Sequence, residues 1–179
     1  MNLITKRVHM NRCNGREVKQ LTLDRDFNVP DARPDALQIM KEQGEVQIEE
    51  VHMMEGKASV KGLLHFQILY ASDGDIPVSE MTGTIPFEET IPLPQAKAED
   101  EISVQAEIGD LKSELINSRK LGMKAIVVLN VTAGSVCDGE GAIDIEGGED
   151  IYTKKRTAEV SYLIFSKKDT LRVRDEWKI

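Results

Sequence analysis

The residue types that most often carry catalysis or bind metals are sparse in this sequence and stand far apart. The three histidines, His9, His52 and His65, have no partner at the spacing of a metal site. Cys13 and Cys137 form no CxxC or Cys/His pattern, and we expect both thiols to stay reduced instead of forming a disulfide. The motifs of serine hydrolases, zinc proteases, P-loop ATPases and dinucleotide-binding enzymes are missing from the sequence. We therefore predict no enzymatic activity, no catalytic residue, no cofactor and no metal site.

Charge is distributed unevenly along the second half of the chain. Residues 138–150 hold six acids, four glycines and no base, whereas residues 154–179 hold eight bases and four acids. The acidic stretch lacks the D-x-[DN]-x-[DN]-G spacing of a calcium loop, so we interpret it as a solvated, flexible loop or linker.

Basic side chains are the best candidates for contact with a partner. The segment 117–120 is typical of a turn, in which Asn117 and Ser118 cap backbone groups. Five residues are candidates for such a contact, as an alternative to a purely structural role: Arg119, Lys120, Lys154, Lys155 and Arg156. For the basic segments 1–20 and 154–179 we favour an alternative, in which they neutralise acidic strands of the same or a neighbouring domain.

Composition narrows the class of protein. The chain has 179 residues, a net charge of −8 and a hydrophobic content of 40%. This acidity disfavours a nucleic-acid partner, and the apolar content is too high for a disordered chain. The N-terminus lacks a secretory signal and no apolar run is long enough for a membrane span, so we expect a cytoplasmic location.

Alternation of apolar and polar residues dominates the pattern and predicts strands. It runs through residues 58–70, and through 46–53 with a one-residue slip at Glu49-Glu50 that predicts a β-bulge. Glu55-Gly56 predicts the hairpin turn between these two strands. The prolines within 85–94 predict an edge strand. Residues 121–131 are apolar on both faces and predict a central strand.

Other segments complete the expected architecture. The pattern predicts strands at 3–8 and 18–23 around an Asn14-Gly15 turn, at 102–108 and at 158–164. Pro34, followed by an apolar face, predicts one short helix near 34–43. The sequence thus predicts a mainly β protein, an antiparallel two-layer sandwich with one short helix.

The expected domain organisation places a β domain at 1–150, followed at 151–179 by a β-hairpin arm or the start of a connection to a following repeat. The chain ends inside a predicted strand, so we expect it to be part of a longer protein.

Several stretches, in this order, resemble the SPOCS domain family of sporulation proteins. They are the run VPDARPD at 29–35, continuing to 44–46; 55–57 leading into 69–70; 85–87 with 90–91; 115–120; and 167–170 with Glu176. The resemblance implies a sporulation protein of the clostridial type. In the family's best-known member, SPOCS domains precede a LysM domain, and the protein binds the stage IV sporulation ATPase, protein A. This chain has no LysM pattern, and the ATPase contact is attributed to LysM, so no contact residue is carried over.

We therefore expect a non-catalytic structural and interaction module in spore envelope, or coat, assembly. Its partners would be spore coat or morphogenesis proteins or a further copy of itself. The resemblance places it in the mother-cell cytoplasm at the forespore surface. The alternative is a glycan- or peptidoglycan-binding β-sandwich, for which the eight aromatic residues of the chain offer little stacking surface.

Overall fold

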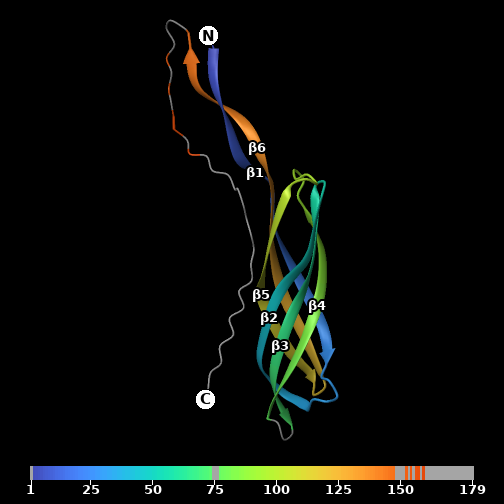
Figure 1. Cartoon of the computed structure of the whole chain (residues 1–179). Coiled ribbons are helices and arrows are strands. Elements are labelled where there is room, and N and C mark those ends of the chain that lie inside the picture. The colour runs from blue at the N-terminus through green and yellow to red at the C-terminus, as the bar shows by residue number, and fades with distance from the viewer. Residues whose placement is uncertain are drawn as a thin grey trace. The chain divides into compact units, whose positions relative to one another are not determined.

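The described part of the chain forms six long strands in two three-stranded sheets. The computed structural model describes residues 2–73 and 77–147, together with Tyr152, Lys154, Arg156, Thr157 and Glu159. The strands are β1 (Asn2–Asn28), β2 (Asp35–Met54), β3 (Lys57–Asp73), β4 (Val78–Pro92), β5 (Glu101–Asn117) and β6 (Lys120–Glu146). Their orders are β1-β6-β5 in one sheet and β2-β3-β4 in the other, and neighbouring strands run antiparallel (Figure 1).

The contacts divide the chain into two compact units. One unit is Cys13–Ser135, here called the body, and the other combines Met1–Arg12 with Val136–Ile179. Within the second unit, residues 2–12 belong to β1 and residues 136–146 belong to β6, and these two strands are neighbours in one sheet. These two segments are here called the ribbon. Both core clusters found among the described residues lie in the body.

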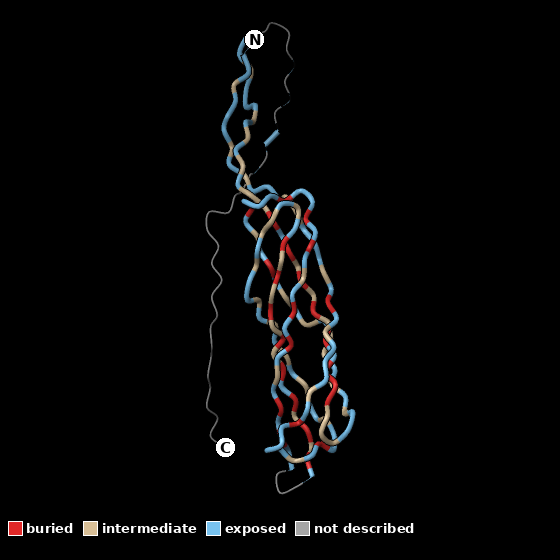
Figure 2. The backbone as a smooth tube through the Cα atoms, turned by 90° about the vertical axis from the view of Figure 1, so that its right-hand side faces the viewer, coloured by how far each residue is buried: buried red, intermediate tan, exposed pale blue. Residues whose placement is uncertain are grey.

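The core of the body lies between the two sheets, as a two-layer sandwich requires. Alternate residues of β3, such as Val60, Leu64 and Ile68, are fully buried, as are Val127 and Leu129 of β6 (Figure 2). Because successive side chains of a strand point to opposite faces, this alternation gives each sheet one apolar face. The mainly β, antiparallel prediction is confirmed.

Several local features also agree with the sequence pattern. Glu49 is an extra residue between two pairs of the β2–β3 ladder, so the predicted bulge is confirmed. Gly56 has a φ of 73° in the hairpin turn, a conformation that favours glycine. The proline-rich strand β4 lies at a sheet edge, and β6 is the central strand of its sheet.

The predicted helix near 34–43 is wrong, because this segment is the first half of β2. Leu37 and Met40 are both extra residues in the ladder with β3. These two bulges place the inward-facing residues Ala36 and Ile39 three positions apart. A spacing of three is typical of one face of a helix, so closely placed bulges imitate the helical pattern.

Two predicted interruptions of the strands are also wrong. Residues 3–8 and 18–23 belong to the single strand β1, which runs through Asn14 and Gly15 without a turn. Gly15 serves close packing instead, since a Cβ atom there would lie 3.0 Å from the Cδ2 atom of Leu93. The first part of the acidic stretch is not a loop, because residues 138–146 belong to β6.

The remaining predictions concern residues beyond those that the structure describes. The strand predicted at 158–164 lies outside the described residues, and the division into 1–150 and 151–179 stays a prediction. Within the described part of the chain, no helix has the length and apolar character needed to cross a membrane.

Candidate interaction site

The loop between β1 and β2 is joined to the turn between β5 and β6 by backbone hydrogen bonds. The N–H of Val29 donates to the carbonyl of Arg119, and the N–H of Ala36 donates to the carbonyl of Ser118, both at 2.8 Å. Tyr70, fully buried in β3, donates its hydroxyl to the carbonyl of Pro34 at 3.3 Å. The loop is therefore held from both sheets.

The guanidinium of Arg119 completes this connection. Nη1 donates to the carbonyl of Arg33 at 2.7 Å and to Oδ1 of Asp35 at 3.2 Å. Nη2 donates to the carbonyl of Val29 at 3.1 Å and to Oδ1 of Asp31 at 3.3 Å. A planar group with five donors can satisfy several acceptors at once, which an ammonium group cannot do in this arrangement. We call these five residues the Arg119 latch.

The turn that carries the latch is held by its own side chains. The N–H of Arg119 donates to Oδ1 of Asn117 at 2.9 Å, as the sequence predicts for a capped turn. Ser118 donates its hydroxyl to Oδ2 of Asp35 at 2.9 Å. The latch is thus a rigid feature of one end of the sandwich, and it contains most of the VPDARPD run.

The candidate contact residues that the structure describes fall into two groups, those paired with acidic residues in the body and those exposed in the other unit. Arg119 is occupied by the latch, and Nζ of Lys120 pairs with Oδ2 of Asp26 at 2.6 Å. Lys154 and Arg156 belong to the other unit and are exposed. Lys155 lies outside the described residues. The contact role of all five stays a prediction, while the acidic partners of Arg119 and Lys120 are visible only in the tertiary structure.

A second polar cluster is centred on Asp100, whose side chain is almost fully buried. Asn14 donates its amide to both carboxylate oxygens at 2.9 Å, and the backbone N–H of Lys97 donates to Oδ2 at 2.9 Å. The bond from Lys97, then that from Asn14, lowers the pKa of Asp100. This cluster fixes the loop before β5, and the sequence pattern offered no signal for it.

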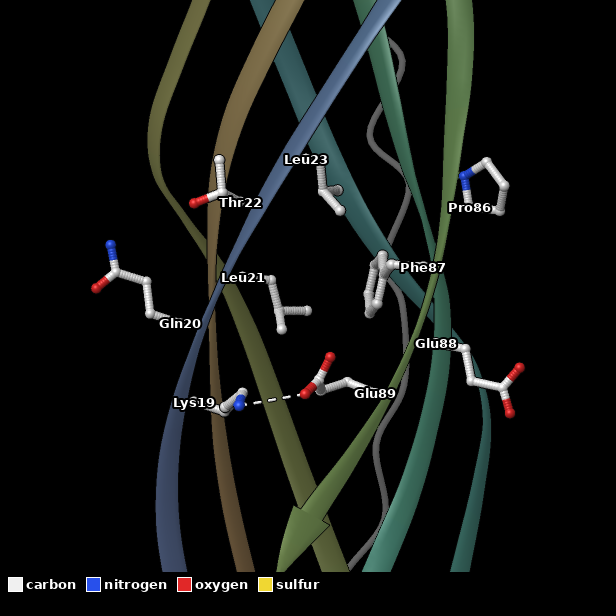
Figure 3. Close-up of a pocket in the computed structure, with 9 residues that line it drawn as sticks. All are labelled: Lys19, Gln20, Leu21, Thr22, Leu23, Pro86, Phe87, Glu88 and Glu89. Atoms are coloured by element: carbon white, nitrogen blue, oxygen red, sulfur yellow. Dashed lines mark ion pairs between the residues drawn. The ribbon is translucent and has the colours of Figure 1, made fainter.

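A groove of about 420 Å³ lies between the edge strands β1 and β4 (Figure 3). Leu21, Leu23 and Phe87 point into it, and an ion pair of 3.2 Å between Nζ of Lys19 and Oε1 of Glu89 crosses its rim. It brings together no acid–base pair suited to catalysis. Proline and charged residues on β4 instead disfavour the pairing of the β4 edge with another strand.

Exposed apolar side chains are also present on the other two edge strands, β2 and β5. Leu37 and Met40, the two bulge residues of β2, are 58% and 61% exposed, and Ile116 of β5 is 47% exposed. Hydrogen bonds of Asp35 and Ala36 to Ser118 bring the start of β2 to the end of β5. We call Leu37, Met40 and Ile116 the β2/β5 apolar residues. Side chains of this kind are common in contacts between proteins.

The described residues contain no group of three or more metal-ligating side chains, and both cysteines are free. Most of their aromatic rings lie in or against the core. Tyr70 is fully buried, Phe87 is nearly so, and Phe27 and Phe66 pack edge to face with centroids 4.6 Å apart. Tyr152 is the exposed aromatic residue of the described part of the chain.

Residues 35–116 match the family model described as SipL, SPOCS domain. The match runs from the start of β2 nearly to the end of β5, and it contains the β2/β5 apolar residues. It supports the SPOCS resemblance on which a sporulation-related module is inferred. No curated protein and no solved structure matches the chain.

Proposed function

We propose that the chain is a non-catalytic interaction module in spore envelope assembly, acting by protein–protein association. The observation that carries this proposal is the match of residues 35–116 to the SPOCS domain model. By family resemblance, the module works in the mother-cell cytoplasm at the forespore surface. Its partners would be spore coat or morphogenesis proteins, the stage IV sporulation ATPase among them where a LysM domain is also present.

The surface chemistry of the matched segment supports a binding role. The β2/β5 apolar residues lie within or at the end of the match, and they are between 47% and 61% exposed, so a partner could bury their side chains. Rigid support comes from the Arg119 latch, which holds the same ends of β2 and β5. An apolar contact on a rigid edge loses little conformational entropy when a partner binds.

Localisation in sporulating cells tests the proposal. A fluorescent fusion of the complete gene product should form a ring around the forespore, and deletion of the gene should detach coat proteins from that surface. The double variant Leu37→Ser/Met40→Ser should lose the ring while the protein remains folded. Val18→Ser is the matched control, because Val18 is similarly exposed and lies outside the matched segment. A diffuse signal from the unaltered protein would refute the proposal.

The alternative of a glycan- or peptidoglycan-binding module makes a different prediction. It requires aromatic rings that converge on an open cleft, and the described residues place most of their rings against the core. Retention of the purified chain on cortex peptidoglycan, undiminished by Leu37→Ser/Met40→Ser, would favour that alternative.

A further inference from the structure

Asn14 and Gly15 form a chemically labile pair that the proposed function does not use. A backbone nitrogen can attack the side-chain amide of the asparagine before it, and glycine hinders this attack least because it has no side chain. Glycine follows Asn14, whereas other residue types follow the remaining asparagines of the chain, which are Asn2, Asn11, Asn28, Asn117 and Asn130. Among these side chains, the amide of Asn14 is therefore the one that its sequence neighbour most exposes to attack.

The amide of Asn14 is held by three acceptor atoms. Nδ2 donates to Oδ1 and Oδ2 of Asp100, both at 2.9 Å, and to Oγ of Ser135 at 3.0 Å. The backbone N–H of Lys97 donates to Oδ2 of the same carboxylate at 2.9 Å. Asp100 is only 5% exposed, and Asn14 is half-buried. These four residues are here called the Asp100 cluster, and Asn14 supplies its side-chain donor from β1.

Close packing requires glycine after Asn14. A Cβ atom on Gly15 would lie 3.0 Å from Cδ2 of Leu93 and 3.6 Å from Cβ of Ala96, which leaves little room for a side chain. Leu93 and Ala96 belong to the loop 93–100, which leads from β4 to β5 and ends at Asp100. The contacts of this loop with β1 thus need a donor at position 14 and space at position 15, and together these two needs create the labile pair.

The same loop is bonded to the turn between β2 and β3. The N–H of Gly56 donates to the carbonyl of Ala96 at 2.9 Å, and the N–H of Leu93 donates to the carbonyl of Gly56 at 2.8 Å. The N–H of Ala98 donates to Oε2 of Glu55 at 3.4 Å. Loss of the Asn14 amide would therefore detach the loop from β1 while leaving it bonded to the sheet that contains β2 and β3.

We propose that Asn14 is a site of deamidation, and that the reaction releases the loop 93–100 from β1 irreversibly. The backbone nitrogen of Gly15 forms a bond to Cγ of Asn14, and the bond from Cγ to Nδ2 breaks. Nδ2 leaves as ammonia and takes the proton of the Gly15 N–H. Water then opens the resulting succinimide ring at either carbonyl carbon and leaves an aspartate or an isoaspartate residue. Water is consumed and ammonia is released, and no oxidant or cofactor is needed.

Local opening of the Asp100 cluster sets the rate of this reaction. β1 is extended through Asn14 and Gly15, and ring closure needs the backbone and the side chain of Asn14 to rotate out of that arrangement. The amide must first leave Asp100 and Ser135, which happens in only a small fraction of the folded molecules at any time. Deamidation is therefore slow in the intact body, and it becomes faster in any condition that loosens the cluster.

The product cannot restore the cluster. An aspartate at position 14 places carboxylate oxygens where the amide donated, so that two carboxylates would face each other and Asp100 would lose its side-chain donor from β1. An isoaspartate lengthens the main chain by a methylene group, which disturbs the alternation of side chains along β1. With either product the loop stays detached from β1. This inference is independent of the proposed interaction function.

Peptide mapping of the purified 179-residue chain tests the site. A glutamyl endopeptidase releases residues 1–17, since Glu17 is the first acid of the chain, and mass spectrometry then follows Asn2, Asn11 and Asn14 in one peptide. In mildly alkaline buffer, the folded chain should gain mass mainly at Asn14. Asp100→Asn should raise this rate about tenfold, because charge-assisted hydrogen bonds are lost. Glu99→Gln, which changes an exposed acid of the same loop, is the control and should leave the rate unchanged.

Two comparisons separate the effect of the cluster from other effects. In urea, Asn14 should be converted at equal rates in the natural chain and in Asp100→Asn, because neither retains the folded contacts. In the folded chains, the conversion of Asn117 should be the same with and without Asp100→Asn, since Asn117 lies outside the cluster. Equal rates at Asn14 in the two folded chains, or an equal increase at Asn14 and Asn117, would overturn the proposal.

Asn14→Asp reproduces the aspartate product and tests the release of the loop. It should lower the urea midpoint by about 0.5–1.5 M. Asn11→Asp adds the same charge at an exposed asparagine of β1 and should shift the midpoint by less than about 0.3 M. In Asn14→Asp the N–H of Lys97, which bonds Asp100, should also exchange with deuterium faster. Equal midpoints for the two variants, with unchanged exchange at Lys97, would show that the product keeps the loop attached and that the proposal is wrong.

Discussion

Replacement of Arg119 by alanine should destabilise the body, because one side chain holds the β1–β2 loop against the turn between β5 and β6. It removes four hydrogen bonds, two to the carbonyls of Val29 and Arg33 and two to the carboxylates of Asp31 and Asp35. A hydrogen bond from a charged donor contributes about 1.5–3 kcal/mol, whereas an exposed ion pair contributes about 0–1 kcal/mol.

The exposure of the latch sets the expected size of the effect. The Arg119 side chain is 34% exposed and Asp31 is fully exposed, so water replaces part of what is lost. We therefore expect the free energy of unfolding to fall by about 2–4 kcal/mol, mainly because the hydrogen bonds to the carbonyls of Val29 and Arg33 are lost. With a urea m-value of about 2 kcal/mol/M, the midpoint should fall by about 1–2 M. Arg119→Lys should recover less than half of this loss, because an ammonium group cannot span the same acceptors.

Urea titration followed by far-ultraviolet circular dichroism measures the midpoint and the m-value. Lys120→Ala is the control, since Lys120 is adjacent and similarly exposed but pairs with Asp26 at the surface. Its midpoint should move by about 0.5 M or less. Equal shifts for Arg119→Ala and Lys120→Ala would show that the latch contributes no more than a surface ion pair, and the reasoning would fail.

Three further predictions concern the core, the bulges and the response to pH. Gly62→Ala should lower the free energy of unfolding by about 1–3 kcal/mol, because the added Cβ would lie 2.5 Å from the ring of Phe87. Gly109→Ala is the control: its Cβ would have its nearest neighbour at 3.4 Å, and thermal denaturation should show a change of less than about 0.5 kcal/mol. Chemical denaturation should show that Leu64→Ala, in the core, lowers the free energy of unfolding by about 2–5 kcal/mol, and that Leu37→Ala, at an exposed bulge, lowers it by less than about 0.5 kcal/mol. Similar losses for the two variants would contradict the outward-facing bulge. The lowered pKa of Asp100 means that its carboxylate stabilises the fold above the pKa of the unfolded chain, about 3.9, and that this stability is lost as the pH falls through the folded value. Asp100→Asn should therefore reduce the dependence of the melting temperature on pH below about pH 4, and an unchanged slope would count against the cluster.

The strands of the body could be predicted because their signal is local and repeated. Alternate burial along β3 follows directly from alternate apolar residues, and the slip at Glu49 marks a bulge since it shifts that alternation by one residue. Proline in β4 indicates an edge strand because it lacks a backbone N–H. Each of these inferences needs only the geometry of one strand.

The start of β2 shows where that reasoning stops. Two bulges in six residues spread Ala36 and Ile39 as a helix would, and only the ladder with β3 reveals Leu37 and Met40 as the extra residues. The candidate site likewise depends on contacts between residues that are far apart in the sequence. The sequence marked Arg119 as a cation in a turn, but its acceptors lie more than 80 positions away along the chain.

The acidic stretch gives the clearest contrast between pattern and structure. Composition alone indicated a loop at 138–150, since glycine and carboxylates disfavour a strand in isolation. Pairing with the basic residues of β1 makes 138–146 a strand, and the contact of Arg7 with Asp138 connects two segments 131 positions apart. The order of residues was sufficient to predict that the chain forms sheets, which strands lie at an edge or in the centre, and where the charges are segregated. These features depend on neighbours along the chain. The latch, the bulges at the start of β2 and the ribbon depend on partners that only folding brings together, so the tertiary structure decided them.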